Sequence, residues 1–216
     1  MKSAAAAAGR DPRDVTLLAV SKTHPAALVE QALAAGQRAF GENYVQEALE
    51  KIDAIRGVEW HLIGPLQSNK TRLVAERFDW VHTIESEKVA RRLSEQRPGS
   101  LAPLNVLIQV NVSGEASKSG IAAERVLPLA EAISNLPGLR LRGLMAVPEP
   151  GAPVARYRAL KDLYEKLKSR FQFDTLSVGM SDDMETAIAE GSTMVRIGTA
   201  IFGQRAKAKS AVRLPA

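Results

Sequence analysis

The sequence predicts an α/β fold of the closed (β/α)8, or TIM, barrel class. Short apolar runs alternate with stretches of helical period along the whole chain, as expected for strands and helices that follow one another. Eight such units fit into 216 residues, and an open sheet of eight strands would usually show a wider break or insertion. We therefore expect residues 1–216 to form a single barrel domain.

The first four units are predicted from apolar runs that end in turn residues. Residues 16–22 are short, apolar and β-branched, which indicates a buried parallel strand, and Pro25 suits the first turn of the next helix. Ser68 or Asn69, and Ser86, are the expected helix caps. The expected strands are residues 16–22, 38–43, 59–65 and 80–84, and the expected helices are residues 26–37, 44–56, 68–77 and 86–96.

The last four units continue the same pattern to the end of the barrel. The expected strands are residues 104–112, 139–147, 175–180 and 193–197, and the expected helices are residues 122–136, 154–171 and 182–190. Residues 2–4 are expected to be the last turns of a shortened N-terminal helix, and residues 205–216 a frayed tail. No linker, low-complexity tract or solenoid repeat interrupts the series.

Composition excludes several classes of site. The chain has no cysteine, so it has no disulfide, thiolate metal site or cysteine nucleophile, which is compatible with a cytoplasmic location. The three histidines lack the spacing of a zinc site. No apolar stretch reaches the roughly 20 residues that span a bilayer. The net charge of +5 is dispersed and lacks an aromatic stacking platform, so we expect no specific nucleic-acid binding.

Polar residues at the ends of the predicted strands are the candidate site residues, because barrel active sites lie where strands meet the loops that follow them. Lys22 ends the first strand. Partial burial there would lower its pKa and favour the neutral amine that attacks aldehydes, although an ordinary strand-end lysine is the simpler alternative. The other candidates are Glu42, Asn43, His61, Gly64, Glu85, Asn111 and Met145, with the turns at residues 179–182 and 196–199.

The two turns after the seventh and eighth strands suit a phosphate group. Ser181 offers a hydroxyl beside a helix N-terminus, and residues 196–199 offer a similar turn. Many barrels bind phosphate at this position. Ser181 is equally expected to cap the helix, and for Arg196 the alternative is an ion pair with a neighbouring acid.

An amine, a phosphate cradle and an arginine around one barrel mouth form a layout suited to pyridoxal 5′-phosphate (PLP). Such a cofactor needs a lysine for its aldehyde, a grip on its phosphate and a partner for its pyridine nitrogen. We assign Arg196 to the ring nitrogen, where a cation disfavours protonation of the pyridine. Lys70 and Lys118 are the alternative amines, and solvent exposure is the simpler interpretation of both.

Ordered motifs over nearly the whole chain resemble the pyridoxal phosphate homeostasis protein family, which is related in fold to the barrel domain of bacterial alanine racemases. The matching segments are residues 18–23, 40–47, 60–70, 118–120, 143–145, 179–184 and 196–203. Members of this family usually begin with a longer helix before the first strand. The alanine- and arginine-rich composition suggests a bacterial source.

The resemblance assigns roles to individual residues. It implies that Lys22 holds PLP as an internal aldimine (a Schiff base), that Ser181, Gly198 and Thr199 surround the phosphate, and that Arg196 faces the pyridine nitrogen. It also implies that Asn43 approaches the ring. The expected function is maintenance of the PLP supply, with delivery to PLP-dependent apoenzymes, by a monomer without robust turnover.

A PLP-dependent amino-acid racemase is the alternative function. A barrel-type racemase needs a second base on the opposite face of its substrate, which alanine racemases take as a tyrosine from a separate domain of a partner chain. The barrel leaves no room for that domain, and all three tyrosines fall in predicted helices: Tyr44, Tyr157 and Tyr164. A polyanion-binding barrel is a third possibility, supported only by the net charge.

Overall fold

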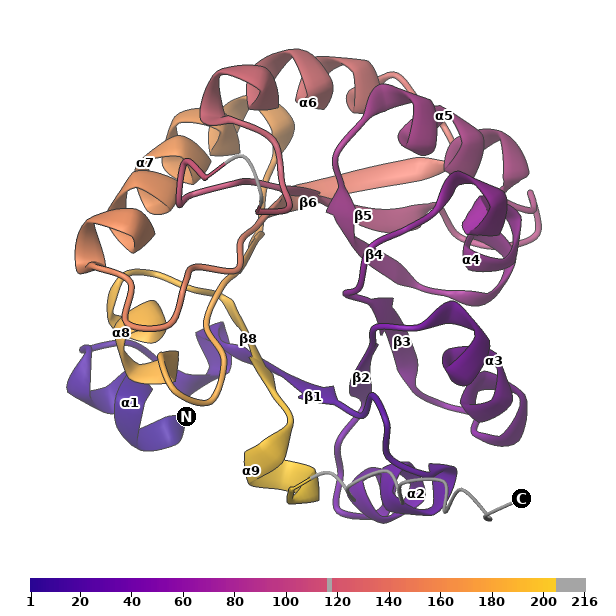
Figure 1. Cartoon of the computed structure of the whole chain (residues 1–216), viewed down its shortest axis with the longest axis horizontal. Helices are drawn as coiled ribbons and strands as arrows, with labels where there is room; N and C mark the ends of the chain where they lie inside the picture. Colours follow the sequence, from indigo (N-terminus) through magenta and orange to yellow (C-terminus); the bar gives the residue numbers. More distant parts are fainter. Residues whose placement is uncertain (116–117, 205–216) are drawn as a thin grey trace, which may run out of the picture.

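Eight parallel strands close into one barrel in the order β1 to β8 (Figure 1). The computed structural model describes residues 1–115 and 118–204, so the frayed tail expected at 205–216 lies outside the described residues. The barrel closes through four pairs of residues between β1 and β8, from Thr16 with Met194 to Ala19 with Ile197. The predicted (β/α)8 class is confirmed.

The strands match the predicted series, and most end earlier than expected. Their bounds are β1 Thr16–Val20, β2 Ala39–Glu42, β3 Glu59–Leu62, β4 Trp80–Ile84, β5 Leu104–Gln109, β6 Leu139–Met145, β7 Thr175–Ser177 and β8 Met194–Ile197. The bounds of β4 are those predicted. The predicted residues beyond the strand ends, such as Lys22 and Asn111, therefore lie in loops at the carboxyl edge of the barrel.

Helices surround the barrel on its outer side (Figure 1). Their bounds are α1 Lys2–Ala7, α2 Ala26–Ala34, α3 Val45–Ala54, α4 Thr71–Arg77, α5 Glu87–Gln96, α6 Val126–Ser134, α7 Val154–Phe171, α8 Met184–Ala189 and α9 Thr199–Phe202. Helix α1 packs against α8 through Ala4, Ala5 and Ile188. No described helix has the length and apolar character needed to cross a membrane.

Strand alternation separates two kinds of side chain. Trp60 and Leu62 belong to the large apolar cluster between the strands and the helices, and the Trp60 ring contacts Phe40 at 5.8 Å. Between them in sequence, His61 belongs to the barrel interior, where its ring stacks on Trp80 at 5.1 Å. The barrel interior is therefore partly polar. The sequence placed His61 at the mouth of the barrel, and this prediction is wrong, because the side chain lies inside the barrel.

Three predicted helix starts are tested by the cap geometry. Ser86 caps α5 as predicted and accepts the Val89 N–H at 3.4 Å. Ser68 and Asn69 do not cap a helix, because they form a 3-10 turn that precedes α4. Ser181 is not the cap of α8 either. That helix begins at Met184 after Asp183, whose side chain caps no helix N–H and instead accepts the Met180 N–H at 2.5 Å.

Candidate functional site: the cavity at the barrel mouth

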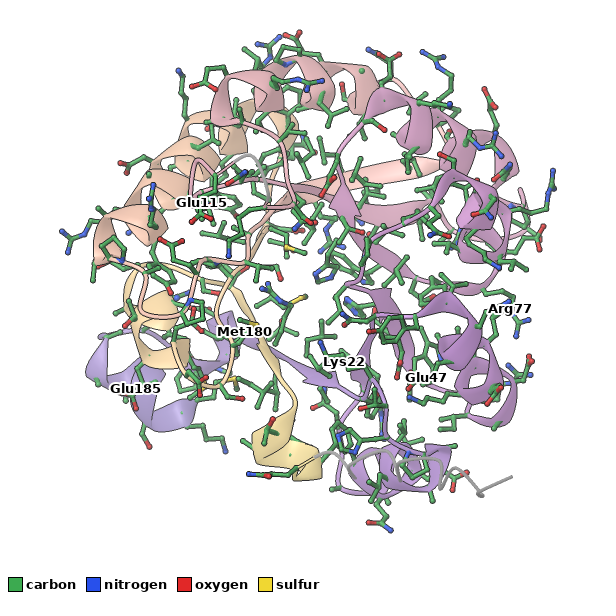
Figure 2. All side chains as sticks on the ribbon, viewed as in Figure 1. Lys22, Glu47, Arg77, Glu115, Met180 and Glu185 are labelled. Carbon is green, nitrogen blue, oxygen red and sulfur yellow. The ribbon has the colours of Figure 1, made fainter. Side chains whose placement is uncertain are left out.

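A cavity of about 480 Å³ opens at the carboxyl ends of β1, β7 and β8. Five of the six predicted cofactor residues line it: Lys22, Ser181, Arg196, Gly198 and Thr199. Figure 2 shows Lys22 and Met180 near the centre of the ring of elements, whereas Arg77 and Glu185 lie on its outside. The volume falls in the usual range for small-molecule pockets, about 300–1,000 Å³.

Lys22 lies in a tight turn just beyond the last residue of β1. The turn is closed by the His24 N–H, which donates to the Ser21 carbonyl at 3.1 Å. Thr23, the third residue of the turn, has a φ of 64°, a left-handed conformation that is rare for a β-branched residue. Val20 lines the same cavity, so the end of β1 supplies both an apolar wall and an amine.

Arg196 on β8 is a buried cation in the cavity wall, with a relative exposure of 4%. Its guanidinium donates to the Ser177 carbonyl at 2.8 Å, the Ser177 hydroxyl at 2.9 Å and the Ala146 carbonyl at 2.9 Å. Burial lowers its pKa to about 10, which leaves it protonated at neutral pH. It forms no ion pair with the described residues. The alternative left open by the sequence, an ion pair between Arg196 and a neighbouring acid, is therefore not found among them.

The loop after β7 presents Ser181 as an exposed residue at the cavity edge. Gly179 has a φ of 101°, which a side chain would strain, and a β-carbon there would lie 2.4 Å from the β-carbon of Ala187. Asp183 is held on one side by the Met180 N–H and on the other by the Tyr157 hydroxyl, which donates to it at 2.6 Å. These contacts shape the loop that carries the Ser181 hydroxyl.

The loop after β8 brings Gly198 and Thr199 to the same cavity. Thr199 is the first residue of α9, and the first N–H groups of a helix have no acceptor within it. A β-carbon on Gly198 would lie 3.2 Å from the Val20 carbonyl oxygen, so a larger residue would press against β1. The prediction that both turns reach one site agrees with this geometry.

Asn43 lines an adjoining cavity and not the one that contains Lys22. This second cavity of about 410 Å³ shares Ile63 and Met180 with the first. The Oδ1 atom of Asn43 is buried without a hydrogen-bond partner among the described residues. Asn43 is therefore in the cavity next to the one that contains Lys22, and Ile63 and Met180 line both.

The alternative amines and the tyrosines occupy different places. Lys118 lines the adjoining cavity, whereas Lys70 ends the 3-10 turn before α4 and lines neither cavity. Tyr44 was predicted within a helix, which is wrong: it is the exposed N-cap residue of α3. Tyr157 and Tyr164 are buried on α7, as predicted for helix residues.

Sequence reasoning missed some residues of the cavity wall and the partners of two buried polar groups beneath it. His24 and Ile63 line the cavity, and the signal for His24 was its position two residues after Lys22. His61 and Glu42 were candidates, but their partners were missed: His82 pairs with His61 inside the barrel, and Lys51 joins Glu42 and Glu47 beside β1. The described residues contain no group of three or more side chains suited to a metal ion.

The fold and its cavity define an alanine-racemase-type barrel, and the family described as alanine racemase, N-terminal domain, matches residues 2–206. The chain is 61% identical over 209 residues to the pyridoxal phosphate homeostasis protein of Pseudomonas aeruginosa, covering 95% of this chain and 91% of that protein. It is 57% identical over 215 residues to the Escherichia coli protein of the same name, covering 95% and 92%. The chain belongs to the family of pyridoxal phosphate homeostasis proteins.

A solved structure supports the same relationship. PipY of Synechococcus elongatus, in a structure with PLP bound, is 36% identical to this chain and has a TM-score of 0.80. The match covers 92% of this chain and 97% of PipY. The likeness therefore extends over nearly the whole of both barrels.

Proposed function

We propose that this protein binds PLP at the barrel mouth and maintains the supply of this cofactor. One observation carries the proposal: Lys22 and Arg196 line the same cavity, together with the hydroxyl residues Ser181 and Thr199. The names of the relatives and the PLP in the PipY structure point to the same ligand. Residues of one cavity thus meet the three needs of the cofactor: an amine, a phosphate grip and a partner for the ring nitrogen.

The residues present fit PLP in both size and chemistry. When bound, PLP supplies an aldehyde that reacts with a primary amine and a pyridine ring that withdraws electrons. Lys22 is the proposed amine. Ser181, Gly198 and Thr199 are the proposed phosphate residues, because their turns offer hydroxyls and backbone N–H groups on one side of the cavity.

Arg196 is the proposed neighbour of the pyridine nitrogen. The guanidinium has five N–H donors, and its three hydrogen bonds among the described residues go to Ser177 and Ala146, which leaves two of the five donors for a ligand. Because the group stays cationic near pH 7, it favours an unprotonated ring nitrogen and makes the ring a weaker electron sink. Asn43 is the proposed polar neighbour of the ring on the side of the adjoining cavity.

Carriage of PLP explains the site better than racemisation does. A racemase needs a proton donor and acceptor on each face of its substrate. Neither cavity is lined by one of the tyrosines, since Tyr44 is exposed at the start of α3 and the other two are buried on α7. We propose a cytoplasmic monomer that yields PLP to PLP-dependent apoenzymes and has weak side reactions at most.

Borohydride trapping tests the proposal directly. Purified protein is incubated with PLP, reduced with borohydride, digested and mapped by mass spectrometry, while the absorbance spectrum is recorded before and after reduction. We expect a pyridoxyl group on Lys22 and loss of the visible absorbance band. No adduct anywhere on the chain, after incubation with excess PLP, would overturn the proposed function.

A further inference from the structure

A buried cluster of charged side chains lies beside the backbone of Lys22. Lys51 Nζ donates to Glu42 Oε1 at 2.8 Å, to Glu47 Oε1 at 2.7 Å and to the Ser21 carbonyl at 2.8 Å. These three acceptors match the three protons of the ammonium group. Lys51 is 4% exposed and Glu42 is fully buried, so water competes little for these bonds.

The cluster contacts the residues on both sides of Lys22. On the N-terminal side, the Ser21 hydroxyl donates to Glu42 Oε1 at 2.6 Å, and the Ser21 carbonyl accepts from Lys51. On the C-terminal side, the Thr23 N–H donates to Glu47 Oε1 at 2.5 Å. Figure 2 shows Glu47 beside Lys22 on the side of α3. Lys22 therefore projects from a turn that is anchored at both flanking residues.

The conformation of Thr23 explains why the turn needs such an anchor. Its φ of 64° lies in the left-handed region, where glycine or asparagine is normally found at the third position of a turn. A strained residue of this kind persists only when its surroundings hold it, and strain of this kind clusters at functional sites. The bond from the Thr23 N–H to Glu47 opposes relaxation of the turn.

The electrostatics of the cluster do not favour a purely stabilising role. Burial raises the pKa of Glu42, while hydrogen bonds from Lys51 and Ser21 oppose that rise. The second carboxylate oxygen of Glu42 is buried without a partner among the described residues. Buried ion pairs are often no more stable than apolar replacements of the same volume. A geometric task is thus the better explanation for burying these charges.

We propose that Glu42, Glu47 and Lys51 are positioning residues that hold the backbone around Lys22 so that its amine enters the cofactor cavity. The inference rests on the proposed function, because it takes Lys22 as the amine that joins PLP. None of the three lines either cavity at the mouth. They act through the Ser21–His24 turn, and not by contact with the ligand.

Glu47 allows a sharp test because both of its hydrogen bonds use the same oxygen atom. Glu47→Gln keeps an oxygen acceptor for Thr23 and Lys51, whereas Glu47→Ala removes it. Glu50→Ala is the matched control, because Glu50 is an exposed residue on the same helix. The side chain of Glu47 is 27% exposed, so water can reach the space that its truncation leaves.

Two readouts separate positioning from general stability. The first is the rate at which PLP attaches to Lys22, followed by absorbance and confirmed by borohydride trapping. We expect Glu47→Ala to slow attachment about tenfold or more, Glu47→Gln to restore most of the rate and Glu50→Ala to match the wild type. The second is hydrogen–deuterium exchange of the Thr23 amide without PLP, which should accelerate in Glu47→Ala and stay slow in Glu47→Gln.

The outcomes distinguish this proposal from the proposed function. Wild-type protein that takes up no PLP would overturn both. Wild-type protein that takes up PLP at Lys22, with Glu47→Ala equally fast, would overturn the positioning role alone. A slow Glu47→Ala variant that Glu47→Gln does not rescue would also overturn it, because the negative charge would then matter and not the hydrogen bonds to the turn.

Discussion

The Nδ1 atom of His61 lies 3.0 Å from the Nε2 atom of His82 inside the barrel, where both side chains are fully buried. His82 Nδ1 in turn lies 3.3 Å from the Ser177 hydroxyl, which accepts a hydrogen bond from Arg196. A neutral arrangement consistent with these distances has the Ser177 hydroxyl donating to His82 and His82 donating to His61. The histidine pair is thereby linked to Arg196, which lines the cavity at the barrel mouth.

The histidine pair should make the protein sensitive to mild acid. Burial lowers the pKa of His61, and it lowers the pKa of His82 well below the usual value, with further contributions from His61 and Arg196. The unfolded chain takes up protons below about pH 6.5 while the folded pair stays neutral. The free energy of unfolding should therefore fall as the pH drops below 6.5, by up to about 1.4 kcal/mol per pH unit for each histidine.

Urea unfolding between pH 7.5 and pH 5 measures this dependence. The comparison is a double variant, His61→Leu with His82→Leu, in which the other ionisable groups remain. The free energy of unfolding of the double variant should fall less steeply with acid than that of the wild type. Equal slopes for the two proteins would show that the histidine pair does not control acid stability.

Gly64 should tolerate no side chain, because the end of β3 lies against the loop that carries Asn43. A β-carbon at position 64 would lie 2.1 Å from the Asn43 carbonyl oxygen. We expect Gly64→Ala to reduce the free energy of unfolding by about 1–3 kcal/mol, as overpacking usually does. The control is Gly99→Ala, where the new β-carbon meets nothing within 4 Å. Equal unfolding curves for the two variants would contradict this interpretation.

The barrel could be predicted from sequence because its signal is local and repeated. Each apolar run and each helical stretch is short enough to recognise alone, and eight of them in series leave few alternatives. The rule that active sites lie at strand ends then selected Lys22 and Arg196, which the structure brings to one cavity. The same rule selected Asn43, which lines the adjoining cavity. The rule predicts which end of the barrel a residue occupies, and it does not predict which cavity at that end the residue lines.

What sequence reasoning missed depends on contacts between distant residues. Lys51 falls within the helix predicted at residues 44–56, and no local pattern marks it, since its partners Glu42 and Ser21 lie outside that helix and only folding brings them together. The wrong cap at Ser181 has a similar cause. The helix begins at Met184, and the preceding residue, Asp183, accepts a hydrogen bond from Tyr157, which is 26 residues away in sequence. Neither relationship leaves a local pattern.

The charge of Arg196 should be visible in the spectrum of bound PLP. Arg196→Gln removes the cation next to the proposed ring nitrogen, so the pKa of the pyridine should rise. The absorbance of bound PLP, titrated against pH, should shift accordingly. Arg158→Gln is the control, because Arg158 pairs with Glu190 on the outer layer.

The same variant should also be less stable. A glutamine cannot reach every acceptor of Arg196, and the buried carbonyls of Ser177 and Ala146 would lose partners. We expect the free energy of unfolding without PLP to fall by about 1–3 kcal/mol. A lower stability with an unchanged titration curve would remove Arg196 from the ring-nitrogen role and leave it a structural one.

Lys22→Ala should separate covalent attachment from the other contacts of the cofactor. Without the amine, borohydride should trap no pyridoxyl group, and the visible absorbance band should be absent. PLP should still bind, more weakly, because Ser181 and Thr199, the proposed phosphate residues, remain in the cavity. Equilibrium dialysis measures that remaining affinity. Lys118→Ala is the matched control, since Lys118 lines only the adjoining cavity. If the band persisted in Lys22→Ala and disappeared in Lys118→Ala, the covalent bond would be on Lys118, which would contradict this proposal.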